Sequence, residues 1–304
     1  MNSLVFSLMA AGCTSLSSLF FRVSTSRNNI RSPSGFLVLF YFFSLFFTVI
    51  FTPNLKDSPF NSIVWSLGAV VGLLSSTLML LTFHALKNGP AGLTFSFQNA
   101  SAIFPGLLLF LFLGSVYGYS CSFTQVLGMS IVLLGLYFGT KSQSSDQQKG
   151  SSRWLKYALG CFFIQILALT LIQGRCVLFD ATPADGLFAN FNFSIKDDRW
   201  FLPGFFTAAF ALQLSLFLWE RNKLKTQEIV YGCLGGITNS SSTYLLLLAT
   251  KSALPFEKTI LFPCFAVVAM ILCNIWANKI YNEKFNFKSN FLCSVGIFLG
   301  IYSS

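Results

Sequence analysis

The stretch from Asn88 to Thr140 reads NGPAGLTFSFQNASAIFPGLLLFLFLGSVYGYSCSFTQVLGMSIVLLGLYFGT, and none of its 53 residues carries a charge. A helix that crosses the hydrocarbon core of a bilayer, about 30 Å thick, needs roughly 20 apolar residues. The stretch is too long for one crossing and has the length of two. We place the turn between them at the segment rich in Gly, Ser and Tyr, Gly114–Ser120. The stretch therefore predicts two transmembrane helices.

The rest of the chain repeats this pattern in shorter units. Eight further charge-free intervals have lengths that fit one crossing each, the last being the shortest. They are residues 1–21, 32–55, 58–86, 157–174, 200–219, 229–250, 259–278 and 289–304. The intervals lack the alternating polarity of β-strands in outer-membrane barrels, which span the bilayer with about ten residues each. We therefore expect an all-α polytopic membrane protein with ten transmembrane helices.

The composition also indicates a membrane protein. Of the 304 residues, 54% are hydrophobic and only 10% are charged, whereas a soluble domain has about 45–50% apolar and about 25% charged residues. These values exclude a cytosolic enzyme, a disordered regulator and a disulfide-stapled secreted domain. The formal net charge of +10 would indicate nucleic-acid binding in a soluble protein, but in a membrane protein it reflects the sorting of loops across the bilayer. We expect membrane lipids and no nucleic acid as partners.

The chain divides into two similar halves. The longest polar run, Lys141–Arg153, is typical of a flexible linker, with a first five-helix unit in residues 1–140 and a second in 154–304. The segment Gly72–Lys87 resembles Gly236–Lys251 in its Ser-rich and then Leu-rich run, at an offset of 164 residues at both ends. Because five is an odd number of crossings, a duplicated unit would be inserted upside down. We therefore expect two inverted five-helix repeats, with a solute site between them near the bilayer midplane.

The first half resembles a known family. The run Phe83-His84-Ala85-Leu86, followed by Gly89-Pro90-Ala91 and then by Pro105, is similar to spans three and four of the EamA-like drug/metabolite transporter superfamily. One departure lies after span four, where the family usually has Gly-Glu and this chain has Gly114-Ser115. The resemblance implies a secondary transporter with ten spans arranged as five plus five.

The second half carries the same resemblance. Leu248-Ala249, Pro263 and the run Tyr281-Asn282-Glu283 before a Gly-containing last helix are similar to spans eight to ten of that family. Glu283 is thus the acidic residue of this motif that the chain keeps. The loop at residues 175–200 is longer than the family's loop between spans six and seven. With both halves included, the resemblance covers nearly the whole chain.

Two arguments about orientation disagree. With the loops numbered between successive spans, fourteen of the 20 Lys and Arg lie in odd-numbered loops and six in even-numbered loops. Because cytoplasmic loops carry the excess of positive charge, this bias puts both termini outside the cytoplasm. The family resemblance implies both termini inside. The sequence leaves both orientations open, together with the oligomeric state.

Polar side chains inside the spans are the candidate site residues. An amide or hydroxyl group in a hydrocarbon environment is costly unless it finds a partner or lines a wet cavity. The alternative is that these groups only join helices to one another. An aromatic ring could add a wall for a flat or cationic ligand. The candidates for solute binding are Gln98, Asn99, Ser101, Asn239, Ser242, Asn274 and Trp276.

Two prolines are candidate helix breaks. Pro105 and Pro263 lie within spans four and nine, where each removes a backbone donor and loosens a helical turn. Discontinuous helices of this kind mark the substrate sites of many transporters. A plain kink is the alternative for both positions.

The sequence carries no motif for catalysis or metal binding. None of the 10 acidic residues, and no Lys or Arg, lies in the middle of a span. Motifs such as GxSxG and HExxH are missing. We therefore expect no enzymatic activity, no catalytic residue, no metal and no cofactor. A proton-coupled exporter of cations would need a buried carboxylate, so the neutral spans favour a neutral or zwitterionic metabolite.

These observations predict a secondary transporter that moves a small polar organic metabolite by alternating access. The solute would be an amino acid, a nucleotide-like cofactor or a similar small molecule. The abundance of Phe, Asn, Lys and Ser is typical of an AT-rich genome, and with it we expect a bacterial cytoplasmic membrane. Two alternatives stay open at this point, a lipid-intermediate flippase and a non-transporting membrane assembly subunit.

Overall fold

A computed structural model of the chain describes residues 2–26, 32–52, 55–114, 122–144, 151–175, 198–221, 223–253, 255–283 and 287–301. All regular secondary structure within these ranges is helical, which confirms the expected all-α fold. The α-helices are α1 (Asn2–Ser26), α2 (Ser34–Phe51), α3 (Ser62–Asn88), α4 (Ala91–Ala100), α5 (Pro105–Leu113), α6 (Phe123–Ser144), α7 (Ser151–Gly174), α8 (Phe201–Glu220), α9 (Thr226–Ser252), α10 (Pro255–Tyr281) and α11 (Phe287–Ile301), and the 3-10 helices are η1 (Leu55–Asp57) and η2 (Ser101–Ile103).

The fourth helical segment is interrupted in its middle. The helices α4, η2 and α5 follow one another and together make the apolar segment Ala91–Leu113. Pro105 is the first residue of α5, a position where its missing N–H leaves no helical hydrogen bond unmade. At the other end Gly114 has a positive φ of 74°, and the rest of the expected turn Gly114–Ser120 lies outside the described residues. Counted with this segment as one, the described part of the chain forms ten helical segments.

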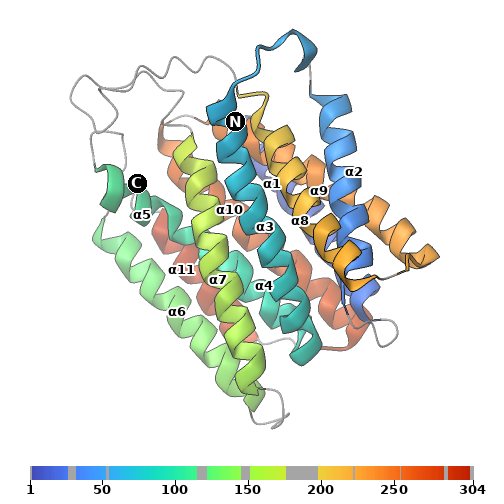
Figure 1. The fold of residues 1–304 in the computed structure, drawn as a ribbon. Coiled ribbons are helices and arrows are strands. Elements are labelled where there is room, and N and C mark those ends of the chain that lie inside the picture. Colours follow the sequence, from blue (N-terminus) through green and yellow to red (C-terminus); the bar gives the residue numbers. More distant parts are fainter. Residues whose placement is uncertain are drawn as a thin grey trace.

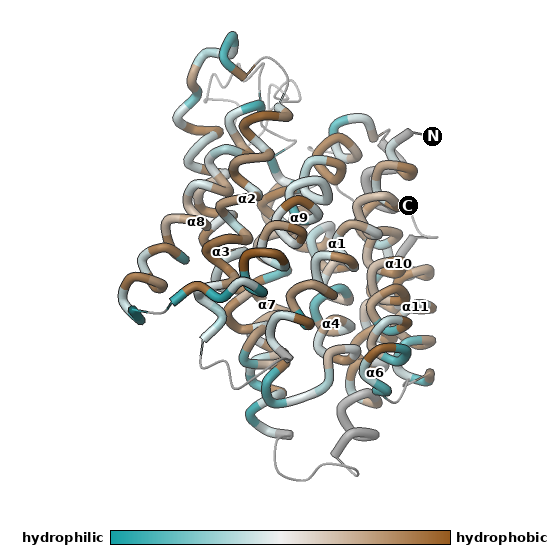
Figure 2. Tube along the Cα trace, turned by 90° about the vertical axis from the view of Figure 1, so that its right-hand side faces the viewer, coloured by the Kyte–Doolittle hydropathy of each residue, from teal (hydrophilic) through white to brown (hydrophobic). Residues whose placement is uncertain are grey.

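Seven helical segments among the described residues are long and apolar enough to cross a membrane. They are α1, α2, α3, Ala91–Leu113, α7, α8 and the Leu261–Tyr281 part of α10. In Figure 2 the hydrophilic residues lie mainly near the helix ends, with hydrophobic residues between them. The chain is therefore a multi-pass membrane protein, as its composition predicted.

The three remaining helices are less apolar or shorter. The apolar parts of α6 and α11 are Phe123–Phe138 and Phe287–Leu299. The helix α9 has 27 residues, as many as α3, but six consecutive polar residues interrupt its centre, Thr238–Thr243. The most polar long helix of the chain is thus one that the sequence predicted to line a site.

The expected linker is shorter than its sequence boundaries. The helix α6 extends to Ser144 and α7 begins at Ser151, so both helices run into the polar run 141–153. Residues 145–150 lie outside the described part of the chain.

The helices pack as two bundles that each combine both halves of the chain (Figure 1). In the α1 bundle, α1 packs against α9 and α10, and α2 packs against α9. In the α7 bundle, α7 packs against α3, α4 and α5, and α8 packs against α3. Contacts of α2 with α8 and of α4 with α10 join the two bundles, while α6 and α11 pack against each other at one side.

Glycines allow the closest helix crossings in each bundle. A Cβ atom on Gly72 of α3 would collide with the backbone carbonyl of Phe205 in α8. In the other bundle, a Cβ atom on Gly236 of α9 would lie 2.5 Å from the carbonyl oxygen of Phe40 in α2. Helices in a membrane use such small residues to bring their backbones together. Gly72 and Gly236 are the two positions that start the matching segments of the sequence.

Candidate functional site

A cavity of about 130 Å³ lies between the two bundles. All eight helices α1–α4 and α7–α10 contribute to its wall, whereas α6 and α11 contribute no lining residue. The lining residues are Thr14, Ser17, Ser18, Phe21, Phe40, Tyr41, Ser75, Leu78, Met79, Phe95, Gln98, Asn99, Gln165, Leu169, Ile172, Phe205, Asn239, Ser242, Thr243, Leu246 and Phe265.

The wall of this cavity is polar but uncharged. Eleven of its residues carry hydroxyl or amide groups, and the others are Phe, Leu, Ile or Met. Hydroxyl and amide groups can hydrogen-bond an uncharged polar molecule, and the aromatic rings can pack against an apolar or flat part of it. An ion placed here would lose its hydration without gaining a charged partner, which is costly. The cavity therefore suits a small uncharged molecule with polar groups.

Four of the predicted site residues lie in this wall. Gln98 and Asn99 reach it from α4, and Asn239 and Ser242 from α9. The first pair belongs to the α7 bundle and the second to the α1 bundle. The structure thus brings together residues that the sequence placed more than 100 positions apart.

Gln98 has an unused acceptor. Its side-chain oxygen Oε1 is buried and has no hydrogen-bond partner among the described residues. The neighbouring Asn99 donates from Nδ2 to the Phe95 carbonyl oxygen at 2.9 Å, within the same helix. A buried acceptor without a partner is unfavourable, so a bound molecule with an N–H or O–H donor would remove that cost.

The polar residues of α9 already have partners in neighbouring helices. The Ser242 hydroxyl donates to the Ala10 carbonyl oxygen at 2.8 Å and lies 2.5 Å from the hydroxyl of Thr14. Asn239 donates from Nδ2 to the Ser44 hydroxyl at 3.3 Å. These bonds join α9 to α1 and α2. Ser242 and Asn239 therefore hold the α1 bundle together while they face the cavity.

The other three predicted binding residues lie outside the cavity wall. Ser101 is buried in η2 and donates to the Gln98 carbonyl oxygen at 2.6 Å. Trp276 donates from its indole N–H to the Ser15 hydroxyl at 3.2 Å. Its ring meets Phe95 edge-on with centroids 5.6 Å apart. Trp276 thus lies one ring behind the wall and supports a residue that lines it.

Asn274 joins three helices. Its Nδ2 atom lies within hydrogen-bond distance of Ser96 Oγ in α4 at 3.2 Å, Asn290 Oδ1 in α11 at 3.0 Å and the Met270 carbonyl oxygen of its own helix at 2.9 Å. The residue is buried. In this structure Asn274 therefore has the helix-joining role that was the alternative to solute binding.

We expect Asn274→Ala to lower the free energy of unfolding by roughly 1–3 kcal/mol, because it leaves the buried acceptors on α4 and α11 without their donor. The apparent unfolding temperature in detergent would measure the loss. Asn278→Ala is the control, because it removes an exposed amide one turn further along α10 that donates only to the Glu283 carbonyl oxygen. Equal unfolding temperatures for the two variants would contradict this role.

The two predicted helix breaks behave differently. Pro105 begins α5 after the 3-10 helix η2. Pro263 lies inside α10, which continues through it to Tyr281. A proline within a membrane helix can be tolerated because packing against neighbouring helices supports the loosened turn, and Phe265, two residues further on, is part of the cavity wall. The interruption expected at Pro263 is therefore not observed.

Several wall residues were not among the sequence candidates. The hydroxyl residues Thr14, Ser17 and Ser18 share one face of α1 at the spacing of a helical turn, and Gln165 reaches the wall from α7. Tyr41 lines it from α2. Gln165 could have been recognised, since it is an amide in the middle of the charge-free interval 157–174.

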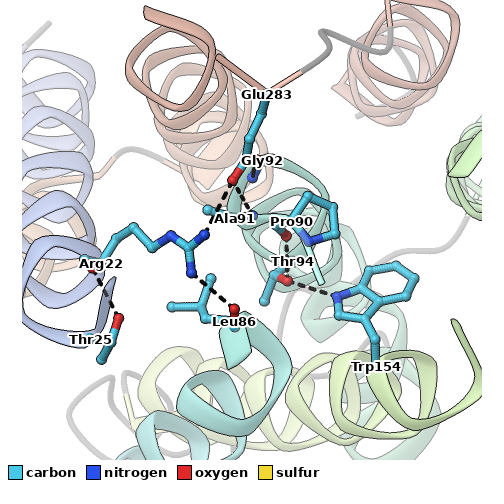
Figure 3. Close-up of polar contacts among 9 residues, drawn as sticks. All are labelled: Arg22, Thr25, Leu86, Pro90, Ala91, Gly92, Thr94, Trp154 and Glu283. Carbon is cyan, nitrogen blue, oxygen red and sulfur yellow. Dashed lines mark hydrogen bonds and ion pairs between the residues drawn. The ribbon is translucent and has the colours of Figure 1, made fainter. Parts of the chain in front are cut away.

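A charged cluster closes one end of the space between the bundles (Figure 3). The Glu283 carboxylate accepts hydrogen bonds from the backbone N–H groups of Ala91 at 2.9 Å and Gly92 at 2.8 Å, at the start of α4. Arg22 lies 3.6 Å from this carboxylate and donates from Nη1 to the Leu86 carbonyl oxygen at 2.9 Å. Asn282, with a φ of 50°, ends α10 and directs Glu283 to this position. A carboxylate at a helix N-terminus is favourable for the helix dipole.

A second charged cluster contains Arg175, at the end of α7. Its guanidinium lies 3.5 Å from the Asp198 carboxylate and donates from Nη2 to the Thr250 hydroxyl at 3.4 Å. It also lies over the ring of Phe201 at 4.9 Å from the centroid. Asp198 additionally pairs with Lys251 of α9 at 3.3 Å. The Arg175 side chain is only 1% exposed.

Comparison with known proteins identifies the fold but no family. No model of a known protein family and no curated protein sequence matches the chain. Among solved structures, the chain is similar to a protein crystal structure with a TM-score of 0.62 and 12% sequence identity. The similarity covers 98% of this chain and 94% of that one. At this identity the similarity establishes a shared fold over nearly the whole length.

Proposed function

We propose that the chain is a secondary transporter of the drug/metabolite type, which moves a small uncharged polar organic solute across the membrane by alternating access. The observation that carries this proposal is the uncharged polar cavity between the two bundles, with a wall built by four helices of each half. A cavity at the meeting of two related units can open to either side when the units rock against each other.

We infer further that the two halves are inverted five-helix repeats. The helix contacts support this inference. If the first-half helices α1–α4 and α6 are exchanged for α7–α10 and α11, the contact of α1 with α9 becomes that of α7 with α3. The contact of α2 with α9 becomes that of α8 with α3, and the pairs α2–α8, α4–α10 and α6–α11 exchange with themselves. Two copies related by a two-fold axis in the membrane plane would have this pattern.

The residues at these contacts support the same inference. Each glycine crossing in one bundle has a counterpart in the other at an offset of 164 or 165 residues. The pairs are Gly68 against Phe201 with Gly232 against Phe36, and Gly72 against Phe205 with Gly236 against Phe40.

Residues of the cavity wall follow the same offset. Ser75, Leu78 and Met79 line the cavity from α3, and the positions 164 residues later, Asn239, Ser242 and Thr243, line it from α9. With this symmetry the less apolar helices α6, α9 and α11 also cross the membrane, which gives ten spans. We assign the chain to the EamA-like drug/metabolite transporter superfamily on this basis and place it in a bacterial cytoplasmic membrane.

The class of solute follows from the wall. An amino acid or a nucleotide-like cofactor would bring ionised groups into a cavity whose lining has no charge to balance them. The acceptor of Gln98 favours a solute that donates at least one hydrogen bond. The cavity has room for on the order of ten water-sized spheres. We therefore expect an uncharged molecule of about that many non-hydrogen atoms, with N–H or O–H groups.

We expect proteoliposomes that contain the purified chain to exchange a labelled uncharged metabolite for an internal unlabelled pool of the same compound. The screen compares uncharged, zwitterionic and anionic metabolites, with protein-free liposomes as the control. Flux of a labelled lipid instead of a soluble metabolite would favour the flippase alternative. Loss of all flux across the panel, with the chain folded and monodisperse, would contradict the transporter and favour an assembly subunit.

A further inference from the structure

We propose that the two charged clusters are the two gates of the transport cycle, with Arg22 and Glu283 closing one end of the cavity and Arg175 and Asp198 closing the other. This inference rests on the proposed transport function, because a gate has meaning only for a site that opens to two sides. It adds the residues that hold each end closed and predicts that the two ends open alternately.

Each arginine lies directly beyond the cavity wall. Arg22 follows the wall residue Phe21 and is one helical turn past Ser18. Arg175 is three residues past the wall residue Ile172. Residues three or four apart lie on the same face of a helix. Both arginines therefore point along the face of α1 or α7 that leads out of the cavity.

The two clusters lie at opposite ends of α3. Arg22 bonds the carbonyl oxygen of Leu86, near the C-terminal end of that helix. A Cβ atom on Gly68, near its N-terminal end, would touch the backbone of Phe201 beside Arg175. The 18 residues between Gly68 and Leu86 span roughly 27 Å along a helix. The wall residue Ser75 lies between these two points, so the cavity separates the clusters.

The bonds at each end cross from one bundle to the other. At the first end, Arg22 and Glu283 of the α1 bundle hold the end of α3 and the start of α4 in the α7 bundle. At the second end, Arg175 and Asp198 of the α7 bundle hold Thr250 and Lys251 of α9 in the α1 bundle. In both cases an arginine and a carboxylate from one bundle hold a helix end of the other. Rocking of the bundles must break these bonds at the end that opens.

The matching bonds are related by the same sequence offset as the glycine crossings. Arg22 at the end of the first helix of one half bonds Leu86. Arg175 at the end of the first helix of the other half bonds Thr250, which lies 164 residues after Leu86. The position of Arg175 beside Asp198 also accounts for a buried guanidinium that the cavity chemistry does not use.

The two gates differ in strength. At the first end, the crossing bonds measure 2.8–2.9 Å and the carboxylate binds two backbone N–H groups. At the second end, the crossing contacts measure 3.3–3.4 Å, and the Lys251 side chain is 67% exposed. Short charge-assisted hydrogen bonds are the stronger kind, and exposed ion pairs contribute little. The end closed by Arg175 and Asp198 therefore opens more readily.

Hydrogen exchange of the full chain in lipid nanodiscs tests this proposal without a solute. We expect Glu283→Ala to raise amide exchange in residues 89–95 by about tenfold or more, because the start of α4 loses its acceptor. The same variant should slow exchange in residues 246–253, since a shift toward opening at one end closes the other. Asp198→Ala should produce the opposite pair of changes, with a smaller amplitude. The control Asn278→Ala should leave both ends as in the wild type.

A rise in exchange at both ends, or a rise at the altered end alone, would overturn the gate proposal. If Glu283→Ala does not fold, Asp198→Ala provides the same comparison from the other end. The solute-exchange assay separates this proposal from the proposed function. Flux with uncoupled ends would reject only the gates, whereas coupled ends without any flux would reject only solute transport.

Discussion

Replacing Gly72 by alanine is expected to force α3 away from α8 and to lower the free energy of unfolding by about 3 kcal/mol or more. The added Cβ atom would collide with the backbone carbonyl of Phe205. A backbone group cannot rotate away as the end of a side chain can, so the two helices must separate. We expect an apparent unfolding temperature lower by on the order of 10 °C, measured on the purified protein in detergent, together with a smaller monodisperse fraction.

Gly12→Ala is the matched control for this substitution. An added Cβ at Gly12 would have nothing within 4 Å, so the change should stabilise α1 slightly through the better helix propensity of alanine. Gly236→Ala should repeat the loss seen for Gly72, because its Cβ would lie 2.5 Å from the Phe40 carbonyl oxygen. If Gly72→Ala and Gly12→Ala had the same unfolding temperature, the close crossing of α3 and α8 would be wrong.

Gln98→Leu is expected to lower solute exchange by on the order of 10- to 100-fold while the unfolding temperature stays constant or rises, since a hydrogen bond to a buried group contributes about 1–3 kcal/mol. The buried oxygen Oε1 has no partner among the described residues, so its removal breaks no bond within the protein. A leucine of similar size also removes an acceptor that is unfavourable when no solute is bound. The same purified variant should be assayed for exchange in proteoliposomes and for thermal unfolding.

Ser242→Ala is the contrasting variant for Gln98. The Ser242 hydroxyl bonds both α1 and the neighbouring Thr14, so its loss should lower stability as well as exchange. Full exchange activity in Gln98→Leu would show that this acceptor does not meet the solute. A large drop in the stability of Gln98→Leu would instead identify Gln98 as a structural residue.

The helical segments could be predicted because the bilayer imposes a simple length rule. The charge-free interval 229–250 became α9, Thr226–Ser252, and the interval 200–219 became α8, Phe201–Glu220. Charges are too costly in hydrocarbon to be placed elsewhere. The break at η2 and the grouping of α1 with α9 and α10 depend on packing between distant segments, which no length rule contains.

The candidate site could be predicted only in part. Gln98 and Asn239 gave a clear signal because an amide in a membrane helix needs a partner or a cavity. Asn274 gave the same signal, but its partners Ser96 and Asn290 lie 178 and 16 residues away. Only the folded structure shows that the amide of Asn274 is already satisfied.

Two kinds of site residue gave little or no signal. Hydroxyl residues such as Thr14 can bond the backbone of their own helix, so their presence in a span is not unusual. Arg22, Arg175 and Glu283 fell in expected loops, where charges are ordinary. Their pairing across the bundle interface depends on which helix ends meet, and this was not accessible from the sequence.

The mixed membership of the bundles has a consequence for how the protein is made. Thr14 and its partner Ser242 are 228 residues apart in the chain, so α1 enters the membrane long before α9 leaves the ribosome. At a translation rate of roughly 5–20 residues per second, this interval is about 10–45 s. During it, the hydroxyl face of α1 lacks its permanent neighbour and has to be shielded by lipid headgroups, water or an insertion chaperone. Newly synthesised first halves should therefore be the most vulnerable stage of its biogenesis.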